Sequence, residues 1–346
     1  MNRFVRLMCA TSVAVALATP ALLAHHSAAA FDTQKEVTIS GVVKSYRFAN
    51  PHVMLFVEVK QDDGSVVTMD VEAGAASVLN GLGFTKDSLK VGDLVTISGN
   101  PNRTNPTAMI GKDLYKKPDG IYVPLNISSK SVYEAKVNGT ATTIAGTWFS
   151  PMRSFSGVMG AINRVPVTDK GKAVRAAADP RLSSQKDCVP IGEPTVMVYP
   201  VATKIDVQKD KVVIRTDWMD TERTIYVDGR KHPAATQTFL HGHSVGRWEG
   251  KALVVETTNF KEHPSGISGT LPSSTEKKLT ERFEVAEDGK TLKYSGTVED
   301  PVYLTGAAQF TANLEYRPGM PFSGQKCDIQ IAQRYLKDLE AQPRAR

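Results

Sequence analysis

Hydrophobic and polar positions alternate with a period of two along much of the chain, which is typical of β-strands with one buried face. In the first third, an Ala/Leu-rich segment at 73–82 ends at Gly83 and predicts a short helix. Five strand-like segments surround it, at 36–48, 52–60, 65–71, 90–99 and 107–114. Three strands, a helix and two more strands form the order of an OB-type barrel.

A second β-rich block begins at Gly146-Thr147-Trp148, and this Gly-x-Trp resembles the first strand of the calycin barrels, the lipocalins and avidins. Seven later segments are strand-like: 196–207, 211–217, 223–227, 252–257, 278–285, 291–298 and 309–316. Eight strands in total predict an up-and-down barrel whose interior holds one small ligand. Residues 152–190 interrupt this pattern and predict an insertion, which is either a lid over the barrel mouth or an excursion of the chain on the surface. Within it we expect a short helix at 170–178, with Thr168 near its N-terminal cap.

The start of the chain has the pattern of a secretory signal peptide. Arg3 and Arg6 precede an apolar stretch at 7–18, and small residues follow up to a predicted cleavage site after Ala24. The stretch is short for a membrane span. We therefore expect a protein of the periplasm or one that is secreted.

These patterns predict an all-β chain, with an OB-like N-terminal barrel followed by a lipocalin/calycin-like antiparallel barrel. The predicted parts are a signal peptide at 1–24, an OB-like domain at 25–125, a linker at 126–144, the second barrel at 145–335 and a tail at 336–346.

Composition narrows the classes of function. Hydrophobic residues make up 41% of the 346, which excludes bulk disorder, and a single long apolar run excludes a multi-span membrane protein. The formal net charge of +6 is spread over interleaved acidic and basic residues, so it predicts no nucleic-acid partner. The predicted OB face offers Tyr46, Phe48 and Phe56 with few basic neighbours.

Export changes the interpretation of the three cysteines. Cys9 leaves with the signal peptide, and Cys188 and Cys327 remain as an even pair in an oxidising compartment. We expect a disulfide between them within the second domain, and the alternative is two buried free thiols.

Cleavage after Ala24 would place His25 at the new N-terminus, followed by His26. A terminal histidine offers an amine and an imidazole nitrogen to one metal, and such ligands suit Cu(II) or Ni(II). His52 is the nearest candidate for a third ligand, so the sequence predicts a copper site at these three histidines. The alternative is a terminus with two incidental histidines.

A second candidate site lies around His241 and His243, which would share one face on a strand and could bind a metal or move a proton near neutral pH. In a catalytic reading one histidine is a general base, Asp228 or Glu249 orients it, and Arg247 stabilises negative charge. The structural alternative is a β-hairpin shaped by Gly and Asp turns. Classical zincin, P-loop and C-x-x-C motifs are absent from the sequence.

Two stretches resemble known blocks. HHS at 25–27, NPH at 50–52 and the strand entry near Gly92-Asp93 resemble an uncharacterised bacterial exported domain over residues 25–115. YVDGRxHP at 226–233 and GHSVGRWEG at 242–250 resemble a β-rich block of uncharacterised secreted bacterial proteins, over residues 145–335. Both resemblances imply export and β-rich folds, and neither implies a reaction.

The leading functional hypothesis is non-catalytic binding of a small apolar or amphipathic ligand in the second barrel, with copper on the first domain. The rival is a lyase, isomerase or hydratase that acts on a small hydrophobic compound in the same barrel. A third hypothesis is an envelope structural protein without a ligand. The sequence does not address the oligomeric state.

Overall fold

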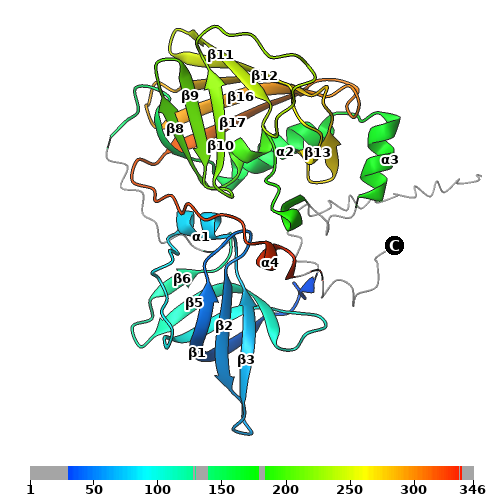
Figure 1. The fold of residues 1–346 in the computed structure, drawn as a ribbon. Coiled ribbons are helices and arrows are strands. Elements are labelled where there is room, and N and C mark those ends of the chain that lie inside the picture. Colours follow the sequence, from blue (N-terminus) through cyan, green and yellow to red (C-terminus); the bar gives the residue numbers. More distant parts are fainter. Residues whose placement is uncertain (1–29, 128, 130–138, 179–183, 335, 337–346) are drawn as a thin grey trace, which may run out of the picture.

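A computed structural model describes residues 30–127, 129, 139–178, 184–334 and 336 of the chain. Two β-barrels with few helices make up this part, so the predicted all-β class is confirmed (Figure 1). Among the helices described there, none has the length and apolar character that crossing a bilayer requires. The predicted signal peptide lies outside the described residues.

The N-terminal barrel has the predicted order of three strands, a helix and two strands. Its strands run β3-β2-β1-β4-β5, and a parallel pairing of β3 with β5 closes them into a five-stranded barrel. Helix α1 ends at Gly83, whose φ of 103° is the left-handed conformation that glycine adopts most readily. The elements are β1 (Val37–Arg47), β2 (Met54–Lys60), β3 (Val66–Glu72), α1 (Ala76–Leu82), β4 (Leu94–Pro101) and β5 (Ala108–Lys117), with a short β6 (Tyr122–Pro124) added beside β5.

The C-terminal barrel is closed by nine strands, where the sequence pattern predicts eight. The additional strand is β11 (His243–Glu249), which the glycine and histidine content of this segment conceals. It pairs in parallel with β10 and antiparallel with β12, so the barrel is antiparallel as predicted except at the β10–β11 pairing. The other strands are β7 (Gly146–Phe149), β8 (Ala202–Val207), β9 (Lys211–Thr216), β10 (Thr221–Tyr226), β12 (Ala252–Thr258), β15 (Lys278–Val285), β16 (Thr291–Glu299) and β17 (Ala308–Tyr316).

The insertion between β7 and β8 contains two helices, α2 (Met152–Arg164) and α3 (Asp169–Ala177), and two 3-10 turns, η2 (Ser184–Asp187) and η3 (Thr195–Val198). The predicted cap of α3 is confirmed, because the Thr168 hydroxyl accepts a hydrogen bond from the Gly171 amide. The sequence pattern does not predict α2. This helix packs along β17 and adds Val158 and Ile162 to the barrel core. A hairpin of β13 (His263–Ser268) and β14 (Leu271–Ser273) contacts it.

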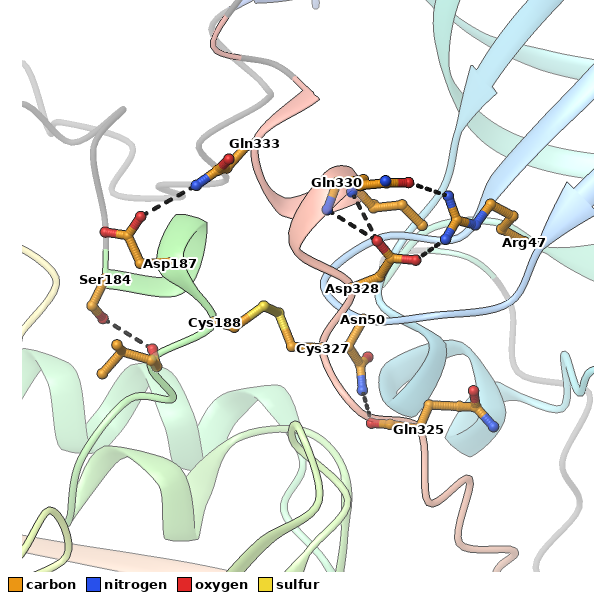
Figure 2. The surroundings of a disulfide bond; sticks show 12 residues. Arg47, Asn50, Ser184, Asp187, Cys188, Gln325, Cys327, Asp328, Gln330 and Gln333 are labelled. Carbon is orange, nitrogen blue, oxygen red and sulfur yellow. Dashed lines mark hydrogen bonds and ion pairs between the residues drawn. A yellow bond between two sulfur atoms is a disulfide. The ribbon is translucent and has the colours of Figure 1, made fainter.

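After β17 the chain returns to the N-terminal barrel as a C-terminal strap, which we define as residues 317–334. It includes α4 (Ile329–Ala332) and lies between the two barrels (Figure 1). The predicted disulfide is confirmed, and it joins Cys188, which follows η2, to Cys327 of the strap (Figure 2). Cys327 also forms an isolated parallel β-bridge with Asn50 of the N-terminal barrel. The disulfide therefore connects the insertion of the C-terminal barrel to a segment that lies on the N-terminal barrel.

Apolar contacts reinforce this junction. A separate buried cluster joins α1 of the N-terminal barrel to the insertion and the β9–β10 turn of the C-terminal barrel. Its buried members are Ala75, Val78, Ile191, Val196, Val201 and Trp218. The disulfide indicates an oxidising compartment outside the cytoplasm, because such bonds are rare in the reducing cytosol.

Candidate functional site

A groove of about 640 Å3 opens beside the ends of β12, β15 and β17 in the C-terminal barrel. Its wall mixes ionisable, amide and apolar groups from segments that are far apart in sequence. The lining residues include His232, Asn259, Lys277, Asp300, Leu304 and Ala307. This volume falls within the range of small-molecule sites in proteins.

His232 lies on the loop before β11, and the Asn259 side chain holds this loop against the groove. The Asn259 side-chain amide donates to the carbonyls of Pro233, Ala234 and Gln237 at 3.4, 3.0 and 2.9 Å. The same loop ends at Gly242, whose φ is 66°. A Cβ at this position would lie 2.6 Å from the Thr257 side chain, so the turn requires glycine for both space and conformation.

His243 begins β11, and its ring nitrogen Nδ1 lies 3.0 Å from Nδ1 of His232. The ring stacks on Tyr226, with centroids 5.3 Å apart. His232 in turn places Nε2 3.3 Å from the exposed carboxylate of Glu256. Burial lowers the pKa of His243, and the neighbouring His232 and Arg230 lower it further. His243 is therefore a neutral base at physiological pH, one hydrogen bond behind the groove-lining His232.

His241 precedes β11 in the turn and does not share the environment of His243. Its Nδ1 lies 3.0 Å from Oε1 of the fully buried Glu193. Burial by itself would raise the pKa of Glu193, but the adjacent His241 and the cations Arg223 and Lys277 outweigh it and hold this pKa at about 2. Burial opposes protonation of His241, and the Glu193 carboxylate overcomes it and raises the pKa. The two residues therefore form a buried ion pair.

Lys277 connects this ion pair to the groove. Its ammonium donates to the carbonyl oxygens of Glu193 and Gly266 and lies 4.4 Å from the centroid of the Phe260 ring. Burial lowers the pKa of Lys277 to about 8, against the attraction of neighbouring carboxylates. The nearby His263 is buried with Nε2 2.7 Å from the Pro190 carbonyl, and its Nδ1 accepts from the Ser265 amide, so it is held as a neutral tautomer.

The barrel interior carries a second buried ion pair. Arg223 of β10 is 4% exposed and forms a two-point pair with Glu281 of β15, which is 1% exposed. Three hydroxyl groups complete the network. The Tyr294 hydroxyl donates to Glu281 at 2.8 Å, and Arg223 donates to Ser244 and Thr257 at 3.0 and 2.8 Å. Long polar side chains therefore fill part of the interior that the sequence pattern assigns to a ligand.

The remaining predicted catalytic residues lie on the outer surface. Asp228 pairs with Arg230, which holds the pKa of this carboxyl at about 2. Arg247 pairs with Glu249 at 2.9 Å, and Glu249 also pairs with Arg282 of β15. In the structure these three predicted residues bond to one another or to other arginines, and they make no hydrogen bond or ion pair with His241 or His243.

Two of the predicted copper ligands, His25 and His26, lie outside the described residues. His52 is half-buried before β2, with Nδ1 3.3 Å from Glu72 and 3.2 Å from the Ala73 carbonyl. Within the described residues, no group of three or more His, Cys, Asp or Glu side chains is arranged to hold a metal ion.

Sequence reasoning singled out His241 and His243 but missed the residues that surround them. Glu193 and Lys277 occupy segments far from the histidines, and nothing in their local pattern marks them. The available signal for Arg223 and Glu281 was a charged residue at an inward position of an alternating strand. Such a position predicts a buried partner of opposite charge.

Comparison with known proteins identifies only the N-terminal part of the chain. Residues 13–110 match the model of a family of unknown function, DUF6152, which coincides with the barrel predicted to be an exported domain. No curated protein matches the chain. The C-terminal barrel, which carries the 640 Å3 groove and the buried ion pairs, is not identified by these comparisons. Over residues 13–110 the chain is similar to a family without an assigned activity.

Proposed function

We propose that this protein is an exported binding protein that takes up a small amphipathic molecule in the groove of the C-terminal barrel. The observation that carries the proposal is the groove itself, because its volume of about 640 Å3 is that of a small-molecule site. Its apolar wall around Leu304 and Ala307 accommodates a hydrocarbon portion. Exposed polar side chains of the same groove, Thr275, Glu276 and Lys278, provide donors and acceptors for a polar head.

The proposal differs from a lipocalin-like interior site in the location of the ligand. Arg223, Glu281 and Tyr294 occupy the inner layer of the barrel and satisfy one another. A ligand there would have to displace a buried ion pair, which is unfavourable. A ligand in the groove displaces water instead. Export is supported by the disulfide and by the signal-like pattern of residues 1–24.

The test is titration of the full oxidised protein with 8-anilinonaphthalene-1-sulfonate, a fluorescent amphipathic probe. Ala307→Trp places a large ring in the groove at an exposed position, so it blocks the groove without disturbing the core. Ala173→Trp on the exposed side of α3 is the matched control. We expect Ala307→Trp to weaken probe binding at least about tenfold and Ala173→Trp to leave it unchanged. Equal binding by both variants would exclude the groove.

A second candidate function is acid–base catalysis in the same groove, as a lyase, isomerase or hydratase. The observation that favours it is the contact between groove-lining His232 and His243, because the lowered pKa of His243 leaves its imidazole free to accept a proton through His232. The catalytic hypothesis predicts that His232→Gln preserves probe affinity but abolishes turnover of any substrate found. A loss of affinity alone would support the binding function.

Copper binding by His25, His26 and His52 stays a separate proposal, supported by the chelating chemistry of an N-terminal histidine. Mass spectrometry of the secreted chain, followed by Cu(II) titration, tests it. A first residue other than His25 would remove the chelate.

A further inference from the structure

A second groove lies on the N-terminal barrel, where the C-terminal strap crosses β2, β3 and the start of β5. Its volume is about 430 Å3. Aromatic and thioether side chains from the barrel make up the apolar part of its wall, and these are Phe31, Met54, Phe56 and Met109. The charged part contains Asp70 and Glu72 from β3 together with two arginines, Arg47 and Arg334.

The two arginines are not equivalent. Arg47 belongs to the barrel, and Asp328 of the strap neutralises it, as Figure 2 shows. Arg334 belongs to the strap and forms an ion pair with Asp70 of the barrel. Its guanidinium also lies 5.5 Å from the centroid of the Phe56 ring. A carboxylate and an aromatic face together are the elements by which proteins recognise organic cations.

Glu72 provides an independent observation. The residue is only 9% exposed, and its Oε1 is buried without a hydrogen bond in the described part of the chain. The His52 ring places Nδ1 3.3 Å from this oxygen, but the same nitrogen lies 3.2 Å from the Ala73 carbonyl and hydrogen-bonds there. A buried carboxylate oxygen without a hydrogen-bond donor is unfavourable, and a ligand that supplies an N–H group would satisfy it.

We propose that this groove is a binding site for small organic cations with a guanidinium or ammonium head, and that Arg334 occupies it as an internal ligand. Asp70 accepts the cation, Phe56 covers its face, and Glu72 accepts a second N–H group deeper in the groove. The hydrocarbon part of the ligand lies against Met54 and Met109. This site is independent of the groove in the C-terminal barrel.

An internal ligand competes with an external one, because its tether gives it a high effective concentration. Removing the Arg334 guanidinium should therefore reveal the site. The experiment is calorimetric titration of the full oxidised chain with n-butylguanidinium. We expect Arg334→Ala to bind at least about tenfold more tightly than the unmodified chain, while Arg334→Lys retains a competing cation and binds weakly.

Two further variants identify the acceptors. In the Arg334→Ala background, Asp70→Asn and Glu72→Gln keep the shape of each side chain and remove its charge. We expect each to weaken butylguanidinium binding at least about tenfold. Arg282→Ala is the matched control, because this arginine forms surface ion pairs with Glu249 and Glu284 on the other barrel. It should bind like the unmodified chain.

A second measurement does not depend on the folding of any variant. Methyl NMR of methionine-labelled, unmodified protein reports the groove directly, since Met54 and Met109 line it and Met197 lies in the core of the other barrel. Butylguanidinium at millimolar concentration should shift the first two signals and leave Met197 in place. The proposal is overturned by the absence of such shifts, by equal affinity of Arg334→Ala and the unmodified chain, or by acceptor variants that bind undiminished.

Discussion

The interiors of the two barrels are filled by different kinds of side chain. The core cluster of the five-stranded N-terminal barrel consists of hydrophobic residues such as Leu55, Ile97 and Leu114. The nine-stranded C-terminal barrel has a comparable apolar cluster, but its interior also contains Arg223 and Glu281. Barrel diameter grows with the number of strands, so the wider barrel needs longer side chains to reach its centre. An ion pair spans that distance at the cost of removing two charges from water.

The largest expected effect concerns the disulfide, which connects the two barrels. Cys188 and Cys327 are separated by 139 positions, and a crosslink over a loop of this length contributes about 5 kcal/mol in the chain-entropy model. We expect Cys188→Ser/Cys327→Ser to lower the free energy of unfolding and to separate the unfolding of the barrels. Urea denaturation monitored by tryptophan fluorescence and by circular dichroism measures both effects. A single unshifted transition would contradict the structural role of this bond.

The next effect tests the difference between the two interiors. Glu281→Ala leaves the buried Arg223 without a counter-charge and should destabilise the protein by about 4 kcal/mol. Arg223→Met/Glu281→Leu removes both charges, so this double variant should lose less stability than Glu281→Ala alone. Leu114→Ala in the other barrel is the comparator, with an expected loss of about 3 kcal/mol from a cavity. The urea midpoints of the three variants measure these losses of stability. If the double variant loses as much stability as Glu281→Ala, or more, the unpaired charge of Arg223 is not the cause of the loss.

A smaller effect is the pH dependence that the Glu193–His241 pair creates. The pKa of Glu193 falls from 4.5 to about 2 on folding, so its contribution to stability is present above pH 4.5 and is lost as pH falls toward 2. The pKa of His241 rises from 6.5, so its contribution is complete below pH 6.5 and is lost as pH rises through the higher folded value. The pair therefore contributes most between these two limits.

His241→Gln tests this window because it retains the shape of the turn residue and removes the charge. We expect the variant to lose stability mainly between about pH 4.5 and 6.5, with a smaller loss near pH 8. Urea denaturation at a series of pH values provides the comparison. A uniform loss at every pH would show that packing, and not charge, is what His241 contributes.

The smallest expected effect is at the surface. Glu249 is exposed and pairs with Arg247 and Arg282, and ion pairs of this kind contribute little to stability. Glu249→Gln should therefore leave the thermal midpoint and probe binding in the groove unchanged. Differential scanning calorimetry and the fluorescence titration are the measurements. A marked loss of probe binding would restore Glu249 as a residue of the site.

The strands of the N-terminal barrel were predictable because each has one buried face and clear turns, as at residues 62–64 between β2 and β3. Strand β11 was not, because Gly242, Gly246 and Gly250 give it the composition of a turn. Gly246 faces the interior, where a Cβ would lie 2.9 Å from Ile225. Helix α2 was missed for a related reason, since its buried stripe of Ser154, Val158 and Ile162 has only two apolar members and glycine and serine are frequent in the rest of the segment.

For the candidate site, the sequence marked His241 and His243 by their density of titratable groups, but it implied that they act together. Gly242 turns the chain between them, and the structure places one against Glu193 and the other against His232. Local spacing cannot predict such partners, because Glu193 comes from the insertion and His232 is brought back to His243 by the fold of the loop before β11. The pKa shifts depend on those partners and on burial, so they were equally inaccessible.

By itself, the sequence determined that the chain is β-rich, that it has two blocks, and that Cys188 and Cys327 form a pair, because periodicity and composition are local properties. Only the tertiary structure decided where the charges lie. It buried Arg223 against Glu281, placed Lys277 in the wall of a groove, and returned Arg334 to the face of the first barrel. These arrangements depend on contacts between residues far apart in the chain, since the energy of a charge is set by what surrounds it in space.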